Sequence, residues 1–143
     1  MVASQALRDA QAIAERVAAD QAAAAEAAAR YTAEGLPTID DPAFAALAQP
    51  GERLHAIHRS ALLEREEAGA GSGQPVSGSL YLSSQRLLHV GPSLLAIPLD
   101  QIAETMVAVQ RLVLIRLQDG GDLAVEVTQP HLLKVQLEAA QAP

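Results

Sequence analysis

The sequence predicts an α+β protein in which a seven-stranded antiparallel barrel or sandwich is followed by a C-terminal helix and preceded by a long alanine-rich helix. Three observations support this fold class. Residues 4–34 are rich in alanine and contain neither glycine nor proline, short strand-like runs separated by turn residues follow residue 51, and an amphipathic segment ends the chain.

The N-terminal helix is expected to be continuous over residues 4–34, because alanine has the highest intrinsic helix propensity. Gly35 and Pro37 then end it. The second half is nearly uniform alanine, and larger apolar residues follow helical spacing only in the first half, at Leu7, Ala10, Ile13, Ala14 and Val17. Such a helix is about 45 Å long, so we expect it either to project or to pack against another chain.

A connector is expected between this helix and the strand-rich region. The three predicted segments are an alanine-rich helix at 1–36, a connector at 37–50 and a barrel domain at 51–143. Within the connector, Asp41 is a suitable N-cap and Pro42 suits the first position of a short helix. We expect Phe44 and Leu47 to hold this helix against the barrel.

The strands are predicted from alternating apolar residues and from turn signals. Their predicted ranges are 52–64, 78–83, 86–91, 93–99, 103–109, 111–118 and 122–128. The Asp-Gly-Gly run at 119–121 favours a hairpin between the last two. Thr128 is expected to cap the final helix, with Pro130 in its first turn. Leu133, Leu137 and Ala140 share one face of that helix.

Residues 78–89, GSLYLSSQRLLH, resemble the G-x-L-x-L-T-x-x-R-L hairpin of GRAM and bacterial pleckstrin-homology-like (PH-like) domains. The Ile-Pro-Leu run at 97–99, the Asp100-x-Ile102 step and the C-terminal helix follow in the order of that family. Ser83 stands where the family has threonine. The resemblance covers residues 51–141 and implies a PH-like seven-stranded antiparallel barrel capped by a C-terminal helix, with a binding function.

Composition restricts the partners. The net charge is -7, the chain contains one Phe and no Trp, and basic residues are not clustered. Because nucleic acids and anionic membranes are bound mainly through clustered Lys and Arg, nucleic acid is not an expected partner and lipid is disfavoured without being excluded. The chain has no Cys, no signal-like N-terminus and no apolar run near the roughly 18 residues of a membrane span, so a cytoplasmic location is expected.

No catalytic, cofactor or metal site is predicted. His55 and His58 lie three apart on a predicted strand and therefore point to opposite faces, and we interpret all four histidines as surface or barrel-rim residues. The chain lacks a Gly-x-Ser-x-Gly elbow, and the glycine-rich run at 68–78 lacks the ending of a phosphate-binding P-loop. Arg111 and Arg116 are expected on opposite faces of one strand, so neither is assigned to an anion site.

The sequence therefore favours a non-enzymatic binding or scaffolding module whose partner is a protein, possibly a second copy of this chain in a homo-oligomer joined through the N-terminal helix. The alternative is lipid or small-ligand binding at the barrel mouth, between the glycine-rich loop and residues 91–93. The resemblance implies basic residues near the first hairpin loop, and the candidate contacts are Arg59, Arg65 and Arg86. Three acids, Glu64, Glu66 and Glu67, oppose a phosphoinositide site there.

Overall fold

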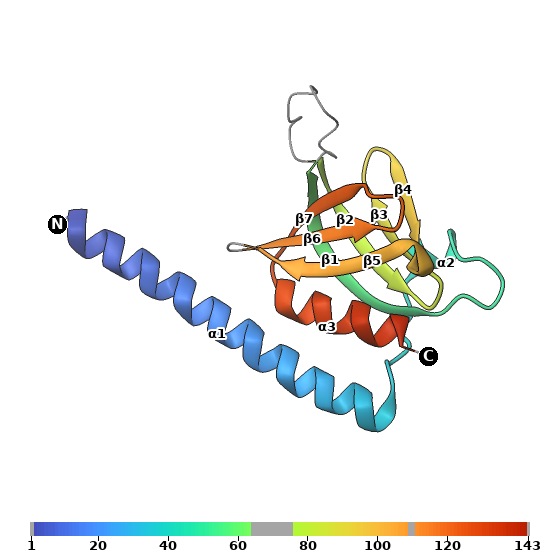
Figure 1. Ribbon diagram of the computed structural model, residues 1–143, viewed down its shortest axis with the longest axis horizontal. Helices are drawn as coiled ribbons and strands as arrows, with labels where there is room; N and C mark the ends of the chain where they lie inside the picture. The colour runs from blue at the N-terminus through green and yellow to red at the C-terminus, as the bar shows by residue number, and fades with distance from the viewer. Residues whose placement is uncertain (1, 64–75, 109–110, 143) are drawn as a thin grey trace.

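The computed structural model of the protein describes residues 2–63, 76–108 and 111–142 (Figure 1). Its elements are α1 (Val2–Glu34), α2 (Pro42–Ala45), β1 (Leu54–Leu63), β2 (Val76–Ser83), β3 (Arg86–Val90), β4 (Leu94–Pro98), the short 3-10 turn η1 (Leu99–Gln101), β5 (Ile102–Val107), β6 (Leu112–Leu117), β7 (Asp122–Val127) and α3 (Pro130–Gln141). The predicted order of helices and strands is confirmed, with ends displaced by a few residues. Arg65 and the predicted strand residues 64 and 109 lie outside the described residues.

The strands form one antiparallel sheet with the order β4-β3-β2-β1-β7-β6-β5. The sheet curls strongly, and α3 lies against its open side (Figure 1). Among the described strands, β4 and β5 each pair with one neighbour only, so the sheet is not closed and the predicted word barrel describes it loosely. The rest of the predicted fold class, seven antiparallel strands followed by a helix, is confirmed.

The main core lies between the concave face of the sheet and α3. In β7, Leu123, Val125 and Val127 are buried while Asp122 and Glu126 are exposed, which confirms the predicted alternation. The apolar face of α3 completes this core with Leu133 and Leu137.

A smaller cluster holds the connector on the opposite face of the sheet. Phe44 of α2 is buried with Leu54, Tyr81 and Leu88, and the ring centroids of Phe44 and Tyr81 are 6.0 Å apart. Asp41 caps α2 as predicted, because its side chain accepts a hydrogen bond of 2.9 Å from the Phe44 N–H. The expectation that Phe44 anchors this segment is therefore confirmed.

Helix α1 divides into two halves with different surroundings. Its C-terminal half packs along α3, whereas its N-terminal half continues past the end of α3 into open space (Figure 1). Ala24 and Ala27 are buried at the contact, and Ala27 is only 1% exposed. Small side chains let two helices approach closely, so the alanine-rich half is the packed half, contrary to its featureless appearance in the sequence.

The N-terminal half carries the larger apolar residues of α1 and leaves two of them, Leu7 and Ile13, uncovered. Leu7 is 70% exposed and Ile13 is 38% exposed. We call residues 4–17 the free half of α1.

Candidate functional site

Asp20 fixes the point at which α1 meets α3. Its Oδ2 accepts hydrogen bonds from the backbone N–H of His131, at 2.8 Å, and from the Nδ1 of the same residue, at 2.9 Å. Its Oδ1 accepts a third from the Leu132 N–H, at 3.2 Å. The side chain is 6% exposed. Asp20 therefore satisfies N–H groups that the first turn of α3 cannot pair internally.

This cap replaces the predicted one. Gln129, not Thr128, is the N-cap residue of α3, and its side chain makes no capping hydrogen bond. Thr128 is exposed. A carboxylate on another helix thus takes the place of a local hydroxyl, which sequence spacing could not indicate.

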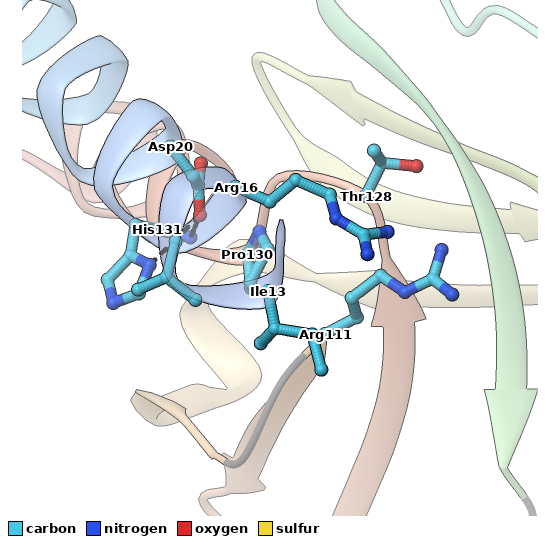
Figure 2. Close-up of a pocket in the computed structure, with 8 residues that line it drawn as sticks. Ile13, Arg16, Asp20, Arg111, Thr128, Pro130 and His131 are labelled. Atoms are coloured by element: carbon cyan, nitrogen blue, oxygen red, sulfur yellow. Dashed lines mark hydrogen bonds and ion pairs between the residues drawn. The ribbon is translucent and has the colours of Figure 1, made fainter. Parts of the chain in front are cut away.

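A cavity of about 210 Å³ opens beside this junction, between α1 and the start of α3. Ile13 and Val17 of α1 and Pro130 of α3 supply apolar lining, and Arg16, Arg111 and Thr128 line it as well. In Figure 2 the Arg16 and Arg111 side chains extend to the same side, towards Thr128 and away from the Asp20–His131 pair. The cavity therefore has apolar lining and two cationic groups, with Asp20 and His131 lining its other side.

Neither guanidinium has an acidic partner within the described part of the chain. Arg16 Nε only donates a long hydrogen bond of 3.4 Å to the Ala12 carbonyl of its own helix. Arg111 lies one residue before β6, and its carbonyl still accepts a hydrogen bond of 2.8 Å from the Val127 N–H of β7. It lines this cavity and a neighbouring one. Arg116, by contrast, forms exposed ion pairs with Glu104 and Asp122. An acidic group from a ligand or partner would find Arg16 and Arg111 available.

The sequence-predicted contacts Arg59, Arg65 and Arg86 are not gathered in one place. Arg59 is exposed on β1 and lines the neighbouring cavity, of about 220 Å³, together with Arg111. Arg65 lies outside the described residues. Arg86 is engaged with Glu52 at the start of β3 and does not line either cavity.

The Arg86–Glu52 pair ties the connector to the β2–β3 hairpin. Arg86 donates from Nε to Glu52 Oε2 at 2.8 Å and from Nη2 to Oε1 at 3.0 Å, and Nη2 also reaches the Leu47 carbonyl at 2.9 Å. Ser83 Oγ donates to Glu52 Oε2 at 2.6 Å. Burial raises the pKa of Glu52, but hydrogen bonds from Arg86, Ser83 and Gln49 outweigh it and hold the pKa below its usual value.

Three of the four histidines are buried, so their interpretation as surface or rim residues is wrong. His55 Nδ1 lies 2.7 Å from the Pro37 carbonyl, and His58 Nε2 lies 2.6 Å from Gln136 Oε1. His89 is buried, and its Nε2 has no hydrogen-bond partner among the described residues. These contacts tie β1 to the connector and to α3, so they account for His55 and His58 structurally. Within the described ranges, no group of three His, Asp or Glu side chains has metal-binding geometry.

We expect the free energy of unfolding to fall as the pH drops from 7 to 5. Burial lowers the pKa of His58, with the Gln136 hydrogen bond and the Asp20 charge opposing it, and burial also lowers the pKa of His89. Between pH 7 and 5 the unfolded chain therefore binds more protons than the folded chain. The contribution of these histidines to the free energy of unfolding is present above their ordinary pKa of about 6.5, and it is lost as the pH falls towards their pKa values in the folded chain.

Urea unfolding between pH 7.5 and pH 5 measures this dependence. Each histidine can contribute at most about 1.4 kcal/mol per pH unit to the slope of the free energy of unfolding against pH. A His58→Gln variant is expected to show a shallower slope than the native chain. Unchanged stability across this range would contradict the expectation.

No protein-family profile matches the sequence, and no curated protein matches it. Solved structures, however, include chains with a similar fold. The Vps36 N-terminal PH domain has a TM-score of 0.55 and 19% identity over 66% of this chain and 82% of that one. The C-terminal domain of an unknown protein from Leishmania infantum has a TM-score of 0.53 and 17% identity over 68% of this chain and 90% of the other.

The chain therefore has a PH-like fold. Because both sequence identities are below 20%, the similarity to these structures shows the fold alone. No helix among the described residues is long and apolar enough to cross a membrane.

Sequence reasoning missed the residues at the α1–α3 junction. Asp20 carried a signal, because it stands among alanines at a position that shares a helical face with Ala24 and Ala27. A carboxylate on a face that is otherwise apolar indicates a buried polar partner. No local pattern could have paired Arg16 with Arg111, because only the fold brings them together.

Proposed function

We propose that this chain is a non-enzymatic PH-like interaction module, of the GRAM-like kind that its β2–β3 hairpin resembles, and that it binds a protein through the free half of α1. The single observation that carries the proposal is the free half itself, a helical segment that leaves the domain with Leu7 70% exposed. Isolated helices of this length are marginal in water and usually depend on packing for their stability.

The chemistry of the cavity at the base of the free half supports a protein partner. It offers apolar lining at Ile13 and Val17 beside two guanidinium groups, and a helix with apolar and acidic side chains matches both features. In this proposal residues 1–36 are the association element, 37–50 the connector and 51–143 the PH-like domain. A cytoplasmic location accords with the absence of cysteine.

Membrane lipid is the less favoured partner. The net charge of -7 repels anionic lipid, and Arg86 is already paired with the buried carboxylate of Glu52. Sedimentation with vesicles containing anionic lipid, at low salt, is expected to leave the chain in the supernatant. Recovery of the chain with the vesicles would support the lipid alternative.

Photo-crosslinking tests the protein-binding function directly. A benzophenone side chain at position 7, on the apolar stripe of the free half, is expected to give discrete protein adducts in cells that produce the chain. The same group at Ala12, which is exposed on the opposite face of the helix, is the matched control and is expected to give none. Adducts with lipid alone, or equal adducts from both positions, would overturn the proposal.

A further inference from the structure

The cavity at the junction of α1 and α3 has two chemically different sides. Ile13 and Val17 of α1 and Pro130 of α3 supply the apolar side. Arg16 and Arg111 supply a cationic side, to which both guanidinium groups extend (Figure 2). We propose that this cavity binds the C-terminal residue of a protein partner, with an apolar side chain on the apolar side and the α-carboxylate at the two guanidinium groups. This inference rests on the proposed function and names the group of the partner that enters the cavity.

The cationic side has no counter-charge among the described residues. Neither Arg16 nor Arg111 forms an ion pair with them, and Arg16 Nε reaches only the carbonyl of Ala12, at 3.4 Å. The neighbouring cavity shares Arg111 and adds Arg59, and Glu126 lines it without an ion pair to either arginine in the described part of the chain. Guanidinium groups that line adjoining cavities repel one another, so a bound anion relieves that repulsion and gains charge-assisted hydrogen bonds.

Asp20 lines the other side of the cavity and does not neutralise these arginines. Its Oδ2 accepts hydrogen bonds from the His131 N–H and Nδ1, and its Oδ1 accepts one from the Leu132 N–H. The side chain is 6% exposed, and the two arginine side chains extend away from it (Figure 2). Asp20 therefore serves the first turn of α3, and we assign the missing anion to another molecule.

The size of the cavity limits the ligand to a single small group. Its volume is about 210 Å³. Cavities that bind drug-sized ligands measure about 300–1,000 Å³. The space therefore suits one amino-acid residue at the end of a partner chain better than a folded segment or a molecule of cofactor size.

A C-terminal residue carries both required groups on one Cα atom. Its side chain and its α-carboxylate branch from that atom, so a single residue reaches the apolar and the cationic side together. An Asp or Glu within a partner segment would supply the carboxylate and leave the apolar side to a second side chain, which this volume does not accommodate. Capture of a C-terminal carboxylate is a recurring mode of peptide recognition, and the planar guanidinium of arginine binds carboxylates through two parallel hydrogen bonds.

Titration with short peptides tests the proposal on the full chain. The probe is acetyl-Ala-Ala-Leu with a free carboxylate, and binding is followed by NMR through the amide shifts of Val17 and His131, which line the cavity. The amidated peptide lacks only the charge and is expected to bind about tenfold more weakly, and the same loss is expected when the last residue is Gly. Equal affinity of acid and amide, or no binding of the acid, would overturn the proposal.

Arg16→Gln and Arg8→Gln form a matched pair of variants. Both arginines are exposed on α1, and each Nε donates a hydrogen bond of 3.4 Å to the carbonyl four residues earlier. Arg16 lines the cavity and Arg8 does not. Arg16→Gln is expected to weaken binding of the peptide acid about tenfold, whereas Arg8→Gln is expected to leave it unchanged. Equal effects would show that the two arginines act through net charge alone, which would refute the site.

Two further outcomes separate this inference from its alternatives. Protein photo-adducts from position 7 without any peptide binding would refute the C-terminal site and leave the protein-binding function intact. Peptide binding without such adducts would support the cavity as a carboxylate site and refute binding through the free half. The free acid 4-methylpentanoate has the side chain and carboxylate of leucine without a peptide bond, so tighter binding of this acid than of the peptide would overturn the assignment to a chain end.

Discussion

Replacing Arg86 with alanine is expected to lower the free energy of unfolding by about 3–5 kcal/mol, the range for removing one partner of a buried ion pair. The Glu52 side chain is 0% exposed and that of Arg86 is 14% exposed, so removing the guanidinium leaves a largely buried carboxylate without its charged partner. The Leu47 carbonyl also loses the donor that holds the connector to the hairpin. Urea denaturation at pH 7 measures the change.

The matched control is Arg116→Ala. Arg116 pairs with Glu104 and Asp122 at 3.9 Å and 3.6 Å, and all three side chains are more than half exposed. Exposed pairs of this kind contribute at most about 1 kcal/mol. If Arg86→Ala costs no more than Arg116→Ala, the Glu52 cluster does not stabilise the fold as we describe.

The pH dependence of the Arg86 variant gives a second test. In the native chain, hydrogen bonds led by the one from Arg86 keep the pKa of Glu52 low against its burial. Without Arg86, the strongest opposition to burial is lost and the folded pKa of Glu52 rises, so protonation relieves more of the buried charge. The deficit of the variant relative to the native chain is therefore expected to shrink as the pH falls from 7 towards 4.

The fold could be predicted from the sequence because local patterns determine most of it. Alternation at Leu123, Val125 and Val127 places a strand with one buried face, and the Asp-Gly-Gly turn at 119–121 pairs it with its neighbour. Closure of the sheet depends instead on whether β4 and β5 meet, and these two strands belong to different hairpins. Local alternation carries no information about that contact.

The candidate site depended on two features that local patterns do not report. Hydrophobic patterning gives weight to large side chains, so it drew attention to Leu7 and Ile13 and overlooked the alanines that pack against α3. The cavity also joins residues from distant parts of the chain, with Arg16 on α1 and Arg111 before β6. The hairpin resemblance directed attention to Arg86, which the structure pairs with Glu52.

Replacing Asp20 with alanine is expected to lower the free energy of unfolding by about 2 kcal/mol, at the upper end of the range for a lost helix cap. The variant leaves the His131 and Leu132 N–H groups without their acceptor at a junction that is largely closed to water. It also removes the polar contact that positions α1 on α3, so amide exchange in residues 20–34 should accelerate more than exchange in the sheet.

Two further variants separate capping from a general effect on α1. Asp20→Asn keeps one oxygen acceptor and is expected to lose about half as much stability as Asp20→Ala. Glu26→Ala removes an exposed carboxylate from the packed half of the same helix and is expected to change stability by no more than about 0.5 kcal/mol. Equal effects of Asp20→Ala and Glu26→Ala would show that the junction does not depend on this carboxylate. The loss in free energy of unfolding is therefore expected to be largest for Asp20→Ala, intermediate for Asp20→Asn and close to zero for Glu26→Ala. This order follows only if Asp20 caps α3 from another helix and thereby determines where α1 leaves the domain.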